Sequence, residues 1–462
     1  MTAPPTPPTS PASPTSPAAP TQPTPGLLSV DAARDAVLAL TAPVGTERIA
    51  ASASLGRITA ERVIALVSLP PWPNSAMDGY AIQAADTDAA QVDAPVELRV
   101  IGDVRAGIAP DVRVVPGSAA RIATGARLPE GADAVVPVEA TTPVDASGMT
   151  GVRGPDAQGP LPAACRVHEV VPWGGSVRAA ASDLQAGAVL LQAGSGITAA
   201  AVALIAGTGV GEVAVHRVPR IGVLATGDEV RSPGEPLGPA GIPDANGPGL
   251  RALVVAAGGQ AIDLGIALDD LHDVVARLRI GLAAGADALI VSGGVSVGPY
   301  DVVKAAIETI GTIDLWRVAV QPGKPFAFGT AERTGGGAAV LLFGLPGNPV
   351  SSAVTFELFV RPAIRRLAGR HDLFRPVDRA ILGEYVTKSH GRRAFLRVEA
   401  ERDATGAPRR DEQGRVRVRL AGGQGSHVMS ALAAADALAV IPEADDSLPA
   451  GAEVALWWLD RA

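Results

Sequence analysis

The alternation of short apolar runs with helical segments over residues 217–370 constrains the fold of this chain more than any other feature. Short apolar runs bounded by Gly and Pro predict buried strands, and apolar residues that recur at three and four predict helices. The expected strands are 220–225, 261–265, 287–292 and 338–343, and the expected helices are 249–257, 271–282, 302–310 and 352–363. Because strands that alternate with helices form a parallel sheet covered on both faces, the sequence predicts a central doubly wound α/β domain over 217–370.

Helical periodicity on either side of a β-rich region predicts a discontinuous helical domain made of residues 27–67 and 176–216. The periodicity is present in 28–40, 49–55 and 176–212, and it is clearest at 199–205. The preceding residues 1–26 are mainly Pro, Thr, Ser and Ala and carry no charged side chain. Such a segment cannot bury enough apolar surface to offset its chain entropy, so we expect a disordered tail.

Short alternating runs separated by Gly and Pro predict two further domains that are rich in strands. One is inserted between the halves of the helical domain, at 68–175, and the other is a C-terminal β domain at 371–462. The expected strands in these domains are 96–101, 119–123, 134–138, 395–399, 416–420 and 437–441. The chain is therefore expected to be a multidomain α/β and β protein.

The charge balance and the cysteine content exclude several classes of protein. Acidic residues outnumber basic ones by 47 to 39, and the sequence shows no basic stripe, so we expect no nucleic-acid partner. Cys165 is the one cysteine, which excludes an internal disulfide framework and a Cys-based zinc site. The residues 1–25 lack the features of a signal peptide, and we find no long uncharged apolar window. We expect a soluble, cytoplasmic protein without a membrane partner.

Three expected strands of the α/β domain end in glycine-rich loops, at 226–229 (TGDE), 292–301 (SGGVSVGPYD) and 344–351 (GLPGNPVS). Ligands of open α/β sheets bind at the carboxyl ends of strands, where glycines let backbone N–H groups approach an anion. We therefore expect the three loops to face one pocket that holds phosphate, although each loop alone could be a plain turn. The residues expected to contact the ligand are Gly227, Gly293, Gly294, Pro346, Gly347, Asn348 and Pro349.

Two aspartates in these loops and one lysine outside them are candidates for binding charged ligands. Asp228 and Asp301 could share a divalent cation that bridges phosphate oxygens, and the alternative for each is a helix N-cap. Lys324 lies between two prolines in the segment 321–326, and these prolines stiffen the turn that presents its ammonium group. A lysine held in this way suits an oxyanion, and the alternative is a solvated surface lysine.

Seven segments of the chain, taken together, resemble the MoeA family, which also includes the C-terminal domain of gephyrin. They are SAMDGYA (75–81), RIATGARLPEGADAVVPVE (121–139), TGDE (226–229), SGGVSVGPYD (292–301), PGKPFAFG (322–329), GLPGNPVS (344–351) and GQGSH (423–427). Their order and spacing also fit the family, and the resemblance covers about residues 27–462. As a set these motifs are highly specific.

The resemblance implies a molybdopterin molybdotransferase. Members of the family insert molybdenum from molybdate into adenylylated molybdopterin, hydrolyse the pyrophosphate bond and release AMP, and they require a divalent cation, usually Mg²⁺. They are elongated homodimers of four domains, with the site in a cleft between domains and subunits. A molybdopterin adenylyltransferase is the candidate protein partner.

The matching positions imply roles for residues of this chain. Asp301 resembles the acidic residue needed for hydrolysis, and Asp228 resembles its partner near the cation, so both are candidate metal ligands. Asp78 and Thr124 resemble site residues on the inserted β domain. The remaining positions that resemble catalytic or substrate-binding residues are Asp183, Lys324, Arg178, Ser296, Ser351, Arg397 and Ser426. An oxyanion substrate requires such lysine, arginine and hydroxyl donors.

Three departures from the family pattern motivate a rival hypothesis. Ala181 and Ser182 stand where the family has Gly and Glu before Asp183, and Ala201 replaces a common glutamate. The rival is a non-catalytic molybdopterin-binding or scaffold paralogue. A third hypothesis is an enzyme that shares only the α/β domain, such as the molybdopterin adenylyltransferase type, and the flanking SAMDGYA and TGA segments argue against it. We therefore expect an active molybdenumtransferase.

Overall fold

The computed structural model describes residues 27–154, 159–294, 302–333 and 336–459. Contacts between residues divide the chain into two compact units. One unit is Thr46–Val215, and the other combines the residues before and after it. The second unit contains the α/β domain and the C-terminal sheet.

A six-stranded sheet forms the centre of the α/β domain, in the order β16-β13-β17-β21-β20-β18. The first four strands run parallel, and β20 and β18 are antiparallel to their neighbours. The bounds are β13 Arg220–Thr226, β16 Gln260–Ala267, β17 Ala288–Ser292, β18 Gly311–Arg317, β20 Pro325–Ala331 and β21 Val340–Leu345. The predicted parallel core is confirmed, and the β18–β20 hairpin at one edge is an addition that the strand–helix alternation did not indicate.

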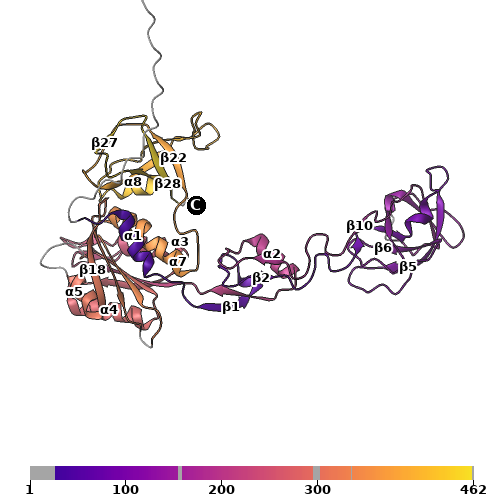
Figure 1. Ribbon diagram of the computed structural model, residues 1–462, viewed down its shortest axis with the longest axis horizontal. Coiled ribbons are helices and arrows are strands. Elements are labelled where there is room, and N and C mark those ends of the chain that lie inside the picture. The colour runs from indigo at the N-terminus through magenta and orange to yellow at the C-terminus, as the bar shows by residue number, and fades with distance from the viewer. Residues whose placement is uncertain (1–26, 155–158, 295–301, 334–335, 460–462) are drawn as a thin grey trace, which may run out of the picture. The chain divides into compact units, whose positions relative to one another are not determined.

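Helices cover both faces of this sheet (Figure 1). One buried cluster joins α1, α3 and the α6–η4–α7 segment to one face, and a second joins α4 and α5 to the other. Their bounds are α1 Val30–Ala39, α3 Asn246–Ala256, α4 Leu271–Ala283, α5 Val302–Ile310, α6 Pro349–Thr355, the π-helical turn η4 Phe356–Val360 and α7 Arg361–Leu367. The predicted doubly wound architecture is thereby confirmed.

The C-terminal residues form a second six-stranded sheet, in the order β19-β24-β25-β22-β28-β26. Because β24 pairs with both β25 and β26, five of these strands close into a ring around a Val, Leu and Ala core. The bounds are β19 Val320–Gln321, β22 Val377–Leu382, β24 Arg393–Ala400, β25 Val416–Leu420, β26 Ala437–Ile441 and β28 Glu453–Trp458, with the short pair β23 Val386–Thr387 and β27 Ser447–Leu448 and the helix α8 Met429–Ala434. A C-terminal β domain was predicted, and it includes one strand, β19, from inside the α/β segment.

The unit Thr46–Val215 is built mainly from strands. Its largest sheet has the order β7-β4-β6-β5-β9-β8, and pairs β1–β12, β10–β3 and β11–β2 accompany it. The bounds are β1 Thr46–Ala50, β2 Val63–Ile64, β3 Asn74–Ser75, β4 Gly79–Ile82, β5 Val96–Val104, β6 Ser118–Ile122, β7 Ala134–Pro137, β8 Thr141–Val144, β9 Ala164–Val167, β10 Val177–Arg178, β11 Val189–Leu191 and β12 Glu212–His216. β4 runs tightly beside β7, since a Cβ on Gly79 would lie 2.0 Å from the carbonyl oxygen of Val136.

Several of the predicted helical segments differ from the structure. The segment expected as a helix at 49–55 forms the end of β1 and a 3₁₀ turn, because pairing with β12 decides its conformation. Within 176–212, β10 and β11 precede α2 (Ala199–Gly207), since short apolar runs do not distinguish a strand from a helix. The helix at 28–40 exists as α1, but Val30, Ala33 and Val37 pack in the core of the α/β domain rather than with 176–212. The four-domain division itself stays a prediction.

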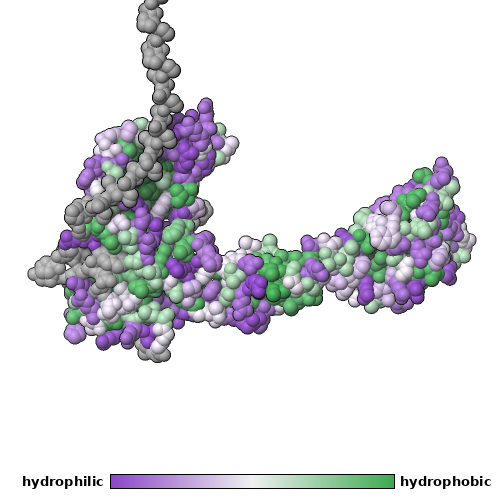
Figure 2. Space-filling model, in the orientation of Figure 1, coloured by the Kyte–Doolittle hydropathy of each residue, from purple (hydrophilic) through white to green (hydrophobic). Residues whose placement is uncertain are grey.

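Helix α2 leaves apolar surface on the unit Thr46–Val215. Its nine residues are Ala, Val, Leu, Ile and Gly, and Ile205 is the one that is buried. Figure 2 shows hydrophobic surface in this part of the unit. A helix that is apolar all round is usually covered on every side, so this surface is typical of an interaction site. None of the helices in the described part of the chain has the length and apolar character of a bilayer span.

Candidate functional site

The three glycine-rich loops line one cavity of about 550 Å³ at the carboxyl edge of the central sheet. Ala225 is paired with Ser292, and Ser292 with Leu345, so β13, β17 and β21 end side by side. The cavity wall includes Thr226 and Ser292 together with all seven predicted loop contacts. The expectation that the three loops face one pocket is confirmed.

The glycines of these loops bring backbone, rather than side chains, to the cavity. Gly293 has a φ of +107°, and a Cβ there would lie 2.5 Å from Thr226 Oγ1. A Cβ on Gly294 would lie 2.5 Å from Val303 Cγ2, and one on Gly347 would reach within 3.7 Å of Gly293 Cα. Larger residues at the first two positions would displace the loop, so its close packing requires glycine.

Hydrogen bonds between the loops fix their relative positions. The hydroxyl of Ser292 lies 3.2 Å from that of Ser352 and 3.3 Å from the carbonyl oxygen of Pro346. The Asn246 amide donates to the carbonyl oxygen of Gly347 at 2.7 Å, which connects the start of α3 to the third loop. The cavity therefore has a rigid wall made of residues far apart in the sequence.

Acidic residues form part of the same cavity, and sequence analysis missed most of them. Glu229, Asp244 and Asp269 line it, and Asp228 Oδ1 accepts a hydrogen bond of 3.1 Å from the backbone N–H of Asp269. Burial, and then the neighbouring carboxylates of Asp228 and Glu229, raise the pKa of Asp269 above its usual value. Asp269 follows β16, the fourth parallel strand, so its position at the carboxyl edge was available as a signal, although its loop lacks glycine. The segment 242–248, rich in turn residues, was the signal for Asp244 and Asn246.

The predicted metal pair is only half within the described residues. Asp228 is exposed beside the cavity, while Asp301 and Ser296 lie outside the residues that the structure describes. Among the described residues, there is no group of three or more His, Cys, Asp or Glu side chains placed to hold a metal ion. The shared site of Asp228 and Asp301 stays a prediction.

The turn that carries Lys324 joins the α/β domain to the C-terminal sheet. Pro325 lines the loop cavity, and a Cβ on Gly323 would meet Thr355 of α6 at 2.6 Å. In the other direction, Gln321 pairs with Ala394 in the β19–β24 ladder. The half-buried Lys324 therefore lies between the loop cavity and the strand that carries Arg397, and Ser351 is buried in α6 beneath the same turn.

Arg397 is a fully buried guanidinium in β24. Its Nη2 donates to the carbonyl oxygens of Gly423 and Gly425 at 3.2 and 3.1 Å, next to the half-buried Ser426. Its Nε has no hydrogen-bond partner among the described residues. Burial lowers the pKa of Arg397 to about 10, because removal from water disfavours the charged form. A buried cation of this kind can bind a small anion.

The remaining predicted residues lie in the unit Thr46–Val215. Asp78 and Thr124 contact each other directly, since Asp78 Oδ1 accepts hydrogen bonds from the Thr124 backbone and hydroxyl. Arg178 is exposed in β10, which pairs with β3 just before Asp78. Asp183 is exposed too, and its backbone N–H donates to the carbonyl oxygen of Leu69 at 3.0 Å.

Models of known protein families match almost the entire chain. The MoeA N-terminal region (domain I and II) matches residues 28–209, a molybdopterin-binding domain described as probable matches 222–366, and the MoeA C-terminal region (domain IV) matches 379–459.

Similar proteins of full length are known. A molybdopterin molybdenumtransferase of Haemophilus influenzae is 34% identical over 93% of this chain and 98% of its own. Molybdopterin molybdenumtransferase 2 of Mycobacterium tuberculosis is 36% identical over 87% of this chain and 92% of its own. A crystal structure of a molybdopterin biosynthesis MoeA protein from Pyrococcus horikosii has a TM-score of 0.74 and 30% identity, covering 94% of this chain and 99% of that chain.

Proposed function

This chain belongs to the MoeA family, and on that premise we propose that it is a molybdopterin molybdenumtransferase of molybdenum cofactor biosynthesis. In this proposal the substrates are adenylylated molybdopterin and molybdate. The enzyme inserts the metal, hydrolyses the pyrophosphate bond and releases AMP. The observation that carries the proposal is the single cavity lined by the loops that follow β13, β17 and β21.

The loop cavity is the proposed site of the pyrophosphate. Gly227, Gly293 and Gly347 bring backbone close to the ligand, and backbone N–H groups bind phosphate oxygens at such turns. The half-buried Lys324 lies on the adjoining turn and would neutralise the charge that grows on the bridging oxygen as the bond breaks. Asp301, at the end of the second loop, is the proposed acceptor of the proton from the attacking water.

Mg²⁺ is the proposed cation, and residues beside the cavity would supply part of its oxygen ligands. Asp228, Glu229 and Asp269 offer the hard carboxylate oxygens that Mg²⁺ prefers. Burial, and then the carboxylates of Asp228 and Glu229, raise the pKa of Asp269, and a bound cation would stabilise its charged form. Asp228, with Asp301, would hold the ion, and its charge would neutralise the phosphate oxygens.

Molybdate is the proposed ligand of the C-terminal part of the site. Arg397 offers a buried guanidinium whose Nε has no hydrogen-bond partner among the described residues, and Ser426 offers a hydroxyl beside it. Arginine binds tetrahedral oxyanions through several N–H groups at once, which suits this position. Lys324 and Ser351 lie on neighbouring elements and complete the proposed set.

The residues of the unit Thr46–Val215 are proposed to act on the same substrate within a homodimer. Asp78, Thr124, Asp183 and Arg178 supply charged and hydroxyl groups. The apolar surface of α2 supports self-association, because its exposed residues are Ala and Gly, its half-buried ones include Val202 and Leu204, and it carries no charge. A molybdopterin adenylyltransferase is the proposed donor of the substrate, and the cytoplasm is the proposed compartment.

The test is an assay of AMP release from adenylylated molybdopterin by the purified chain with molybdate and Mg²⁺. We expect release that stops when EDTA removes the cation. The variant Asp301→Asn should still bind substrate but release no AMP, because the water then has no proton acceptor. Substrate binding by the wild type without AMP release would instead identify a non-catalytic paralogue.

A further inference from the structure

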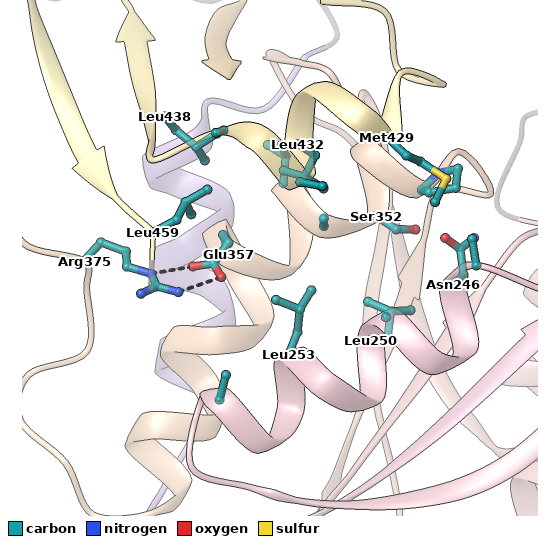
Figure 3. Close-up of a pocket in the computed structure, with 18 residues that line it drawn as sticks. Asn246, Leu250, Leu253, Ser352, Glu357, Arg375, Met429, Leu432, Leu438 and Leu459 are labelled. Atoms are coloured by element: carbon teal, nitrogen blue, oxygen red, sulfur yellow. Dashed lines mark hydrogen bonds and ion pairs between the residues drawn. The ribbon is translucent and has the colours of Figure 1, made fainter. Parts of the chain in front are cut away.

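A second cavity, of about 410 Å³, lies between α3 of the α/β domain and α8 of the C-terminal part (Figure 3). Leu250 and Leu253 face it from α3, and Met429 and Leu432 face it from α8. Its volume is in the range of roughly 300–1,000 Å³ that small-molecule sites occupy. We call it the α3–α8 groove.

The α3–α8 groove adjoins the loop cavity. Ala245, Asn246 and Pro349 line both, so one short wall separates the proposed phosphate site from the apolar groove. Asn246 is held in this wall by its 2.7 Å hydrogen bond to the carbonyl oxygen of Gly347. A ligand whose phosphates occupy the loop cavity can therefore extend a second group into the groove.

The lining indicates which group this is. Its charged residues, Glu357 and Arg375, are buried and bind each other through two hydrogen bonds of 2.9 and 3.0 Å. The other walls are mainly Leu, Ala and Met, so the groove suits a flat ring with few polar demands. The pterin ring carries an amino-oxo edge that requires several polar partners. Its dithiolene must also lie next to the molybdate from which it receives the metal. Adenine is the less polar of the two ring systems that flank the pyrophosphate.

We propose that the α3–α8 groove binds the adenine ring of the adenylylated substrate while the loop cavity holds its phosphates, an assignment that rests on the proposed function. Gly249 offers a way to fill the groove. It lies on the α3 face that also carries Leu250 and Leu253, and an added Cβ would meet no atom within 4 Å. A phenylalanine there occupies free space, and replacing a helical glycine favours the helix.

The test compares two probes, AMP and ribose 5-phosphate, by calorimetric titration of the full chain. Ribose 5-phosphate keeps the sugar and the phosphate but lacks the base. We expect the wild type to bind AMP about tenfold more tightly, and Gly249→Phe to lose this difference, as exclusion of one buried ring predicts. Val255→Phe is the matched control, because Val255 lies on the same helix, is exposed and does not line the groove.

A second variant keeps the test decisive if Gly249→Phe does not fold. Met429 is partly exposed at the groove, so Met429→Ala should fold normally and weaken AMP binding without changing the binding of ribose 5-phosphate. Equal affinity of the wild type for both probes, or unchanged AMP affinity in both variants, would overturn the adenine assignment. If the adenine assignment fails in this way but the wild type still releases AMP, the proposed activity stands. Base-dependent AMP binding by a wild type that releases no AMP supports the groove and refutes the activity.

Discussion

Asp78 Oδ1 accepts two hydrogen bonds from Thr124, one of 2.7 Å from its backbone N–H and one of 2.9 Å from its hydroxyl. The two residues lie 46 positions apart, in the turn after β3 and the turn after β6. These bonds, that from the backbone first, lower the pKa of the Asp78 carboxyl below 3.8 because they favour its charged form. Two motifs that were separate in the sequence thus form one exposed anionic pair.

Thr124→Val should raise the pKa of Asp78 toward its ordinary value, because the hydroxyl bond is lost while the backbone bond remains. A lowered carboxyl pKa stabilises the fold above the unfolded-state pKa and loses this effect as pH falls through the folded-state value. The variant should therefore lose stability at neutral pH and little at the acid end. NMR titration of Asp78 measures the shift. Thr150→Val, at an exposed position of the same unit, should leave the titration unchanged.

The sequence was sufficient to predict the strands at the centre of the α/β domain, because the apolar runs that indicate them are local features. Apolar runs such as 220–225 and 287–292, which alternate with helical segments, indicate buried parallel strands, and the glycines after them mark the ligand edge. The cavity residue Asp269 was missed because its loop has no glycine, although it follows a parallel strand.

Long-range packing explains the other differences. The position of α1 depends on contacts of Val30 and Val37 with residues more than three hundred positions later, such as Phe359, and no local pattern reports them. The β18–β20 hairpin joins the sheet through antiparallel pairing of β20 with β21, which the alternation of strands and helices does not indicate. The apolar face of α1 was visible in the sequence, but its partner was not.

Ala181→Gly should stabilise the unit Thr46–Val215. Ala181 has a φ of +56°, a left-handed conformation that costs a residue with a Cβ roughly 1–2 kcal/mol. Glycine removes this strain but makes the unfolded chain more flexible, so we expect a net gain of up to about 1 kcal/mol in the free energy of unfolding. Chemical denaturation measures it. Ala180→Gly, where φ is not positive, should destabilise the protein, and a gain there would contradict the argument.

Asp269→Asn should raise the Mg²⁺ concentration that AMP release requires, because one proposed carboxylate is lost. It should also stabilise the fold slightly at neutral pH. The raised pKa of Asp269 costs stability above the unfolded-state value, and this cost disappears as pH falls below it. Thermal melting across pH, together with a Mg²⁺ titration of activity, tests both effects. The control is Asp88→Asn, because Asp88 is exposed. Asp270→Asn is not suitable, because the Asp270 side chain caps α4.

Arg397→Met should separate anion binding from stability. Burying a cation costs free energy, and the Nε of Arg397 has no hydrogen-bond partner among the described residues. Replacing it with an apolar side chain of similar length should therefore leave the free energy of unfolding within about 1 kcal/mol of the wild type, or raise it. The molybdate KM should rise at least roughly tenfold, since a charge-assisted hydrogen bond contributes about 1.5–3 kcal/mol. Denaturation and the molybdate dependence of AMP release measure the two quantities.

The comparison with Arg419→Met shows whether the effect of Arg397 depends on its buried position. Arg419 is exposed in the neighbouring strand β25 and pairs with Glu399 at 2.6 Å, so its removal should change neither quantity by much. If Arg397→Met unfolds the protein, the guanidinium is a structural group that holds Gly423 and Gly425. If stability and the molybdate KM both stay unchanged, Arg397 does not bind the oxyanion. Only a large rise in KM at constant stability agrees with a cation kept in the interior for its ligand.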